Sequence, residues 1–181
     1  MEMTQTQSQQ TWEERFVKVV IQGCAEDKGL AAHLRRADNP ATEYQSWELL
    51  ASLHIDLEND YQRLPFVTIA AAIAKSKADH NGGLTLGRAI AACYEDGRES
   101  SQAKARLRRL LACNDLPELC RILRSLFSLI DSKARQPLNF VRLLKQLRRF
   151  SFEDARIRVK AQWAQEFYGQ QVEGQAEEER T

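Results

Sequence analysis

The stretch 82-GGLTLGRAI-90 places three glycines and one arginine around the start of an apolar run. Glycine-rich loops of this kind can bind phosphate through backbone N–H groups. A Walker A loop would also need a lysine followed by serine or threonine at a fixed distance, and these are missing. A dinucleotide-binding loop would follow a strand, but residues 64–77 have the pattern of a helix. The stretch therefore does not predict a nucleotide-dependent enzyme.

Thr85, Gly87 and Arg88 leave two interpretations open. Thr85 is a candidate N-cap, and the free N–H groups of a helix start favour an anion. Alternatively, Gly87 lets two helices pack closely and Arg88 is solvated. The residues alone favour the second interpretation.

Other catalytic chemistry finds little support. The histidines His33, His54 and His80 are scattered and have no acidic partner at a useful spacing. The four cysteines form no Cys-x-x-Cys pair, so buried reduced thiols are favoured over a zinc site. No Ser/His/Asp or Cys/His arrangement can be argued. We therefore expect a protein that is not an enzyme and has no cofactor and no metal.

Basic residues form the strongest pattern in the chain. The net charge is +1, yet residues 1–97 carry −5, residues 98–160 carry +10 and residues 161–181 carry −4. Helix exteriors normally mix the two signs, so concentrated positive charge predicts a polyanionic partner. In predicted helix 101–113, Lys104, Arg108 and Arg109 face away from the leucine stripe and Arg106 flanks it. In predicted helix 116–130, Arg121 and Arg124 lie outside the core face, and in predicted helix 138–150, Arg142, Lys145 and Arg149 share a face.

The expected mode of contact is with backbone phosphates, whatever the base sequence. No helix-turn-helix or zinc-finger pattern indicates base reading in a groove. Stacking on single-stranded bases needs exposed aromatic residues among the arginines, and the aromatic residues of the C-terminal half are predicted to face the core. These are Phe150, Phe152, Trp163 and Phe167.

The predicted fold class is all-α. The chain has only 8 Gly and 4 Pro, and its commonest residues are good helix formers. Capping-box spacing at Thr11 and Glu14, and again at Asp115 and Glu118, marks two helix starts. Ser151 and Asp154 are expected to cap the last helix. We predict a disordered arm (1–10), an N-terminal helical lobe (11–97), a basic antiparallel bundle of about four helices (98–168) and a disordered acidic tail (169–181).

No stretch approaches the roughly 20 apolar residues that a membrane span needs. The N-terminus MEMTQTQSQQ is polar and does not have the pattern of a signal peptide. A cytoplasmic protein without membrane contact is expected.

Several motifs together resemble a known family. They are HLRRADNP (33–40), LTLGRAI (84–90), Arg98, ARLRRLLACND (105–115), LLKQLRRF (143–150), Arg156 and WAQEFYG (163–169). Residues 11–168 resemble the small subunit of the type I-E CRISPR surveillance complex, Cascade. The resemblance implies an all-helical, two-lobed protein without a catalytic site, present as two copies lying head to tail. It also implies contacts with the backbone subunits, guide RNA and target DNA, and a role in holding the opened target.

The resemblance also implies particular nucleic-acid contacts. Arg88 matches the family in the LGRA motif, Arg106 and Arg109 match it in the ARLRRLL motif, and Arg35 with Arg36 matches a basic spot in the N-terminal lobe. Arg88 then becomes a phosphate contact and not part of an active site. The alternative function is a free-standing helical adaptor whose basic face binds an acidic protein.

Overall fold

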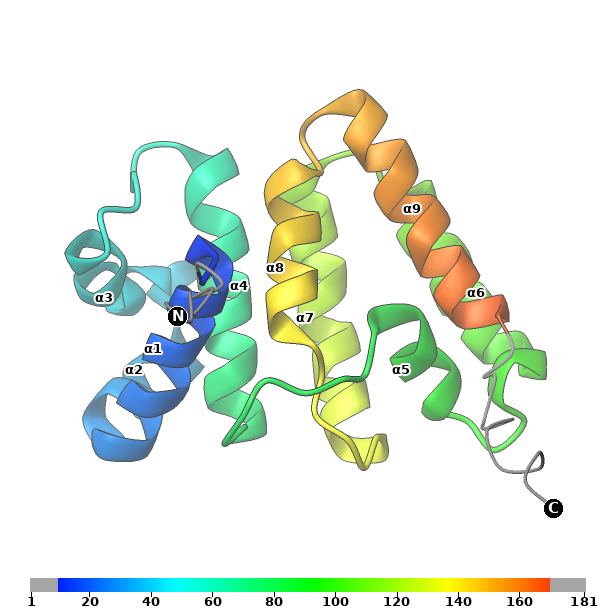
Figure 1. The fold of residues 1–181 in the computed structure, drawn as a ribbon, viewed down its shortest axis with the longest axis horizontal. Helices are drawn as coiled ribbons and strands as arrows, with labels where there is room; N and C mark the ends of the chain where they lie inside the picture. The colour runs from blue at the N-terminus through cyan, green and yellow to red at the C-terminus, as the bar shows by residue number, and fades with distance from the viewer. Residues whose placement is uncertain (1–9, 170–181) are drawn as a thin grey trace, which may run out of the picture.

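The computed structural model describes residues 10–169 and shows nine α-helices there, with no strand in that range (Figure 1). The prediction of an all-α fold is confirmed. Two 3₁₀ helices, η1 (Pro40–Ser46) and η2 (Gly97–Glu99), join some of them. The α-helices are α1 (Trp12–Glu26), α2 (Lys28–Arg36), α3 (Trp47–Ser52), α4 (Asp60–Ser76), α5 (Leu86–Ala92), α6 (Ser101–Ala112), α7 (Leu116–Lys133), α8 (Phe140–Arg149) and α9 (Glu153–Tyr168).

Local sequence signals place several helix starts. The side chain of Thr11 accepts a hydrogen bond from Glu14 N, and the Glu14 carboxylate accepts one from Thr11 N, which completes the predicted capping box. Asp115 caps α7 by accepting from Glu118 N at 3.0 Å. These bonds satisfy N–H groups that a helix start would otherwise leave without partners.

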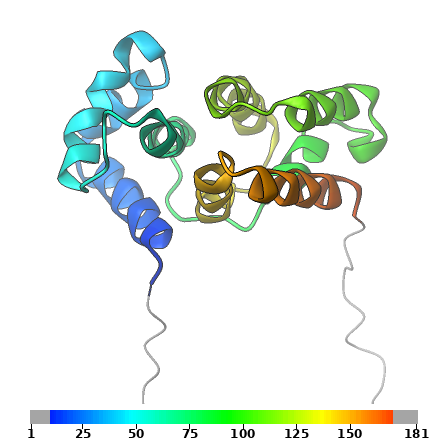
Figure 2. The same ribbon diagram turned by 90° about the horizontal axis from the view of Figure 1, so that it is seen from above.

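Helix α4 is the centre of the molecule. Every residue from 64 to 74 is buried, because α4 packs against α1, α2, α7 and α8. The alanines in this stretch let neighbouring helices approach closely. Viewed from above, α6 and α7 lie behind α8 and α9, so the C-terminal helices form two layers (Figure 2). Helix α5 packs mainly on α9 and also contacts α6 and α7.

Two features of the N-terminal helices depart from simple sequence patterns. Helix α1 continues past Gly23 to Glu26, and Asp27 caps it. A continuous helix would place Tyr44, Trp47, Leu50 and His54 on one face, but of these four residues only Leu50 is buried. Residues 40–46 form a 3₁₀ helix, whose period differs from that of an α-helix and breaks the shared face.

The last helix also starts differently from the prediction. Phe152 takes the N-cap position of α9, without a side-chain cap bond, in place of Ser151. The Phe152 ring is 69% exposed, so its predicted place in the core is wrong. Its position just before the first turn of α9 leaves the ring outside the buried face of the helix. Phe150, Trp163 and Phe167 are buried as predicted.

One continuous hydrophobic core extends from Phe16 in α1 to Phe167 in α9. Because the core connects helices on both sides of residue 97, the division into two lobes remains a prediction. The predicted disordered arm and acidic tail lie almost entirely outside the described residues. No helix of residues 10–169 is both long and apolar enough to cross a membrane.

Candidate nucleic-acid interface

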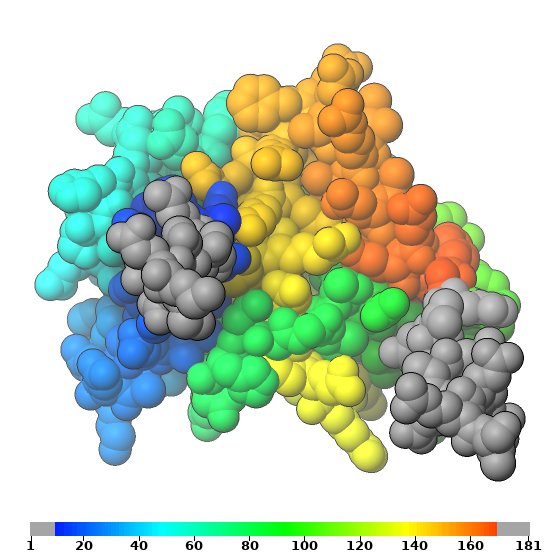
Figure 3. Space-filling model, viewed as in Figure 1, coloured from blue at the N-terminus to red at the C-terminus, as the bar shows by residue number. Residues whose placement is uncertain are grey.

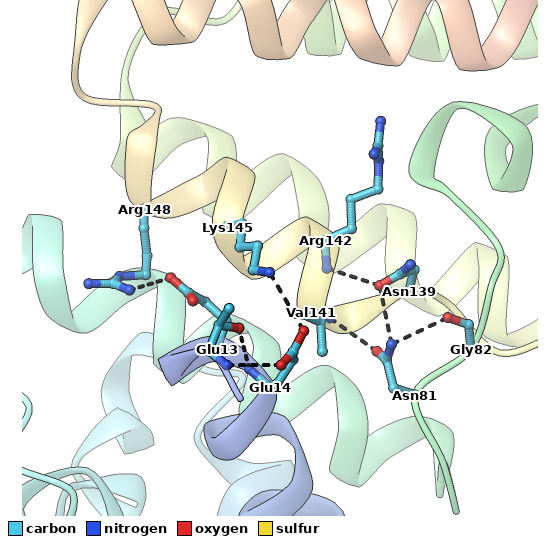
Figure 4. Close-up of polar contacts among 10 residues, drawn as sticks. Glu13, Glu14, Asn81, Gly82, Asn139, Val141, Arg142, Lys145 and Arg148 are labelled. Atoms are coloured by element: carbon cyan, nitrogen blue, oxygen red, sulfur yellow. Dashed lines mark hydrogen bonds and ion pairs between the residues drawn. The ribbon is translucent and has the colours of Figure 1, made fainter. Parts of the chain in front are cut away.

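The glycines before α5 are explained by packing. Gly82 N donates a hydrogen bond to Leu138 O at 2.9 Å, and Leu84 N donates to Pro137 O at 3.3 Å. A Cβ on Gly82 would lie 1.8 Å from Pro137 O, so only glycine allows the two loops to approach this closely. The side chain of Asn81 strengthens this junction, because its amide contacts Asn139 and accepts from Val141 N (Figure 4).

Gly87 has the packing role that the residues alone favoured. A Cβ there would lie 2.3 Å from Trp163 O, which means that α5 and α9 touch backbone to backbone. Gly87 N donates to Glu166 Oε2 at 3.2 Å. The other carboxylate oxygen of Glu166 accepts from Arg142 Nε at 2.9 Å. The start of α5 therefore already holds a carboxylate of the same chain, and an external anion is not needed there.

Arg88 is exposed and lines an open pocket of about 710 Å³. Arg98, Lys133 and Arg135 line the same pocket, so four cations from three separate regions of the chain meet there. Among residues 10–169, the only carboxylate in the lining is Glu166, which is already paired with Arg142. We call this site the basic pocket. Figure 3 shows the segment around residues 80–90 (green) between the yellow α8 region and the end of α9.

Three of the four cations of the basic pocket are not neutralised within the described chain. Among residues 10–169, Arg88, Lys133 and Arg135 have no carboxylate within ion-pair distance. Arg98 donates to Tyr168 O at 2.9 Å and lies 3.6 Å from Glu99. Several unpaired cations around one concave site attract a polyanion, because their potentials add.

Three of these pocket residues were not among the predicted contacts. Arg98 was named only within the family resemblance, and Lys133 and Arg135 were not named. Their clustering depends on the fold, which brings η2, the end of α7 and α5 together. The one signal in the sequence was a pair of basic residues at the end of an amphipathic helix, in the run SKARQP.

The predicted contacts on α6 differ in their surroundings. Arg108 and Arg109 are exposed and have no ion pair within the described chain. Arg106 is also exposed, and its Nε donates to the Tyr94 hydroxyl at 2.9 Å. Lys104 pairs with Glu99 at 3.1 Å.

Burial raises the pKa of the nearby Cys93 thiol, while the positive charges of Arg106 and Lys133 lower it.

The predicted contacts on α8 split into paired and unpaired residues. Arg142 pairs with Glu166 at 2.8 Å, and Lys145 lies 3.8 Å from Glu14. Figure 4 shows Lys145 pointing toward Glu14 and Arg148 toward Glu13, both at the start of α1. Arg149 is exposed and has no ion pair in the part of the chain that the structure describes.

Arg35 and Arg36 lie at the end of α2, and both are exposed. Neither has an ion-pair partner among residues 10–169. Arg35 and Arg36 belong to α2, whereas Arg106, Arg108 and Arg109 belong to α6. The two groups of arginines therefore do not form one cluster. Nucleic-acid binding by the ten predicted contacts on α2, α5, α6 and α8 remains a prediction.

The expectation that exposed aromatic residues are missing needs correction. Phe152 and Tyr168 of the C-terminal half are exposed aromatic residues, as are Tyr44, Trp47 and Tyr61 of the N-terminal half. Tyr168 follows Phe167, which lines the basic pocket, and its carbonyl accepts from Arg98. Tyr168 therefore contacts Arg98 through its backbone, and the aromatic ring in the lining of the basic pocket is the buried ring of Phe167.

Comparisons with known proteins agree with the fold and the motifs. The sequence profile of CRISPR-associated protein Cse2 matches residues 30–168. A CRISPR-associated protein of the Cse2 family from Thermus thermophilus is 24% identical with a TM-score of 0.69, and the match covers 88% of this chain and 99% of that one. A structure of CasB from Thermus thermophilus is 25% identical with a TM-score of 0.68 and the same two coverages, 88% and 99%. CasB from M. ruber is 25% identical with a TM-score of 0.65, covering 86% of this chain and 91% of that one. Among curated proteins, none matches the sequence significantly.

Proposed function

Because this chain belongs to the Cse2 family of CRISPR-associated proteins, and so is the small subunit of the type I-E complex Cascade, we propose that it grips nucleic-acid backbones inside that complex. The proposed ligands are the guide RNA and the target DNA, and the proposed effect is to stabilise the target-bound state. The proposed protein partners are the other subunits of the complex, including the backbone subunits, and a second copy of this chain. We propose a binding function without catalysis.

One observation carries this proposal. The basic pocket gathers Arg88, Arg98, Lys133 and Arg135 around a single concave site, and its one lining carboxylate within residues 10–169 is already paired. Arg88 is also the residue that the family motif LTLGRAI marks. Guanidinium groups bind phosphate oxygens with two parallel hydrogen bonds, so arginines are suited to this contact.

The proposed contact does not read sequence. In RNA-guided machines base pairing selects the target, and protein subunits recognise backbone and shape. Cations that bind phosphates fix position and orientation but contribute the same affinity for any sequence. The exposed arginines of α6 would extend such a surface beyond the basic pocket.

The experiment measures binding of the purified chain to two unrelated single-stranded DNAs and one RNA by fluorescence anisotropy across a salt series. We expect similar affinities for both DNAs and a linear fall of log K with log salt. A second measurement follows target DNA retained by the reconstituted complex with and without this subunit. Binding that is absent at low salt, together with normal assembly and full target retention, would contradict the proposal and favour the adaptor function.

A further inference from the structure

A second pocket, of about 540 Å³, shares residues 134–136 of its lining with the basic pocket. Its lining comes from α2, α4 and the residues that follow it, α7, the segment before α8 and the first residue of α8. The volume lies in the range of small-molecule sites. We call it the inter-helix pocket.

Part of the inter-helix pocket is apolar. The buried residues Ala72, Phe127, Leu138 and Phe140 contribute to its lining. Two of these are aromatic and come from different elements, α7 and α8. Such a surface suits a flat apolar or aromatic group better than a bare inorganic ion.

The rest of the lining is mainly cationic. Arg35, Lys77 and Arg135 line the pocket and have no ion pair within the described chain. Two of the three lining carboxylates are already engaged, since Asp38 accepts from Lys75 Nζ at 2.6 Å and Asp79 contacts His80 Nδ1 at 2.5 Å. Asp131 is the remaining carboxylate. The cationic side chains in the lining therefore outnumber the carboxylates.

Arg124 supplies an independent sign of an unmet contact. Its side chain lines the pocket and is only 15% exposed, and its Nε is buried without a hydrogen-bond acceptor in the described residues. The nearest carboxylate oxygen, Asp38 Oδ1, lies 3.9 Å away. A buried donor without an acceptor costs free energy, so native structures rarely leave one unexplained. An anionic ligand in the pocket would provide the acceptor.

We propose that the inter-helix pocket binds a nucleoside phosphate. The phosphate would contact Arg124 and the unpaired cations around it, and the base would pack on the apolar wall. Asp131 and Ser128, which also line the pocket, offer acceptors for hydroxyl or amino groups. A free nucleotide and a nucleotide of a strand share this chemistry. The proposal does not rest on phosphate binding at the basic pocket, because the two pockets have different lining residues apart from the shared segment 134–136.

The test uses isothermal titration calorimetry on the full chain with four probes: AMP, adenosine, inorganic phosphate and a 5′-phosphorylated dinucleotide. We expect AMP to bind with one-to-one stoichiometry and more tightly than adenosine or phosphate alone. Arg124→Met keeps the apolar stem but removes the charged donors, and should weaken AMP binding about tenfold or more. Arg121→Met, one turn earlier on the exposed side of α7, is the matched control and should leave binding unchanged.

A second variant protects the test against a folding defect. Ser128 is exposed, so Ser128→Trp can fill the pocket without disturbing the core and should abolish AMP binding. Circular dichroism should show parental helix content for each variant. If the dinucleotide displaces AMP and binds more tightly, the natural source is a strand; if AMP binds more tightly, it is a free nucleotide. Phosphate binding as tight as AMP, no AMP binding at all, or AMP binding that neither variant changes would each overturn the proposal.

Discussion

Gly87 donates its backbone N–H to the Glu166 carboxylate at 3.2 Å, and this hydrogen bond joins the first turn of α5 to the last turns of α9. Its position brings the glycine against Trp163 O and Phe167 N with no space for a side chain. Because Glu166 also pairs with Arg142 of α8, three helices meet at one carboxylate. This junction fixes the start of α5, and Arg88, the next residue after Gly87, lines the basic pocket.

Replacing Gly87 with alanine should destabilise the fold. The new Cβ would lie 2.3 Å from Trp163 O and 2.7 Å from Phe167 N, so α5 and α9 would have to separate. Overpacking of this kind costs about 1–3 kcal/mol. Urea unfolding followed by circular dichroism should show a lower midpoint for Gly87→Ala, with an unchanged slope if the compactness of both states is kept.

Gly83 provides the matched control from the same stretch. A Cβ at Gly83 would have no heavy atom within 4 Å, and the backbone of Gly83 is not in the left-handed region. Gly83→Ala should therefore leave stability within about 1 kcal/mol of the parent, on the stabilising side if it changes. An equal loss in both variants would show that close helix packing is not the reason for Gly87.

Features that depend on residues close together in the sequence could be predicted, whereas contacts between residues far apart in the sequence could not. The capping bonds of Thr11 and Asp115 span three residues, and the leucine stripes of α6 and α7 follow from helical periodicity, so both could be predicted. Gly87 and Glu166 are 79 positions apart, and nothing in either local stretch indicates their contact. The basic pocket was missed for the same reason, because its lining comes from separate parts of the chain.

Neighbouring arginines on α8 should behave in opposite ways. Arg148 pairs with Glu13 and lies 5.4 Å from the centre of the Phe66 ring, whereas Arg149 is exposed. Arg148→Met should lower the free energy of unfolding by about 1 kcal/mol, since a partly exposed ion pair and a cation–π contact are lost. The salt dependence of nucleic-acid binding should not change.

Arg149→Met is the matched variant, with the same substitution one residue later. Its stability should equal that of the parent, because exposed arginines contribute little. Its salt slope should fall by up to about one unit if the side chain contacts a phosphate. A stability loss in Arg149→Met as large as that in Arg148→Met would refute the assignment of Arg148 as the structural member of the pair.

Cys120 should make stability depend on pH in the alkaline range. Burial raises the pKa of its thiol from 9.0 to about 11. The folded state therefore keeps the proton while the unfolded state loses it, and the contribution to stability is complete below pH 9 and is lost between pH 9 and 11. In that window the free energy of unfolding should fall by about 1.4 kcal/mol per pH unit from this thiol alone.

The measurement compares the parent with Cys120→Ala in urea at several pH values. The variant has less stability at about pH 7 because it leaves a small cavity, so the comparison uses the slope with pH and not the absolute value. Between pH 9 and 11 the variant should show the shallower slope, and below that window the two slopes should agree. Parallel curves across the whole range would rule out Cys120 as the source.

Changing Arg88, Arg106 and Arg109 together to alanine should weaken nucleic-acid binding. Each phosphate contact that is lost removes about 0.9 released counterions on duplex DNA and about 0.7 on a single strand, so the salt slope should fall by roughly two to three units. The loss should be similar for unrelated sequences, because no base edge is read. All three side chains are exposed, so the melting temperature should stay close to that of the parent.

The matched control for the triple variant removes the same total charge elsewhere. Arg15, Lys18 and Lys28 are exposed on α1 and α2, away from α5 and α6. If a specific surface binds phosphates, replacing these three with alanine should change the salt slope much less than the first triple variant does. In the reconstituted complex, the first variant should still assemble but retain less target DNA, because the lost contacts are with nucleic acid and not with protein. Equal effects of the two triple variants would mean that only net charge matters, and an unchanged slope in both would mean that Arg88, Arg106 and Arg109 form a solvated face.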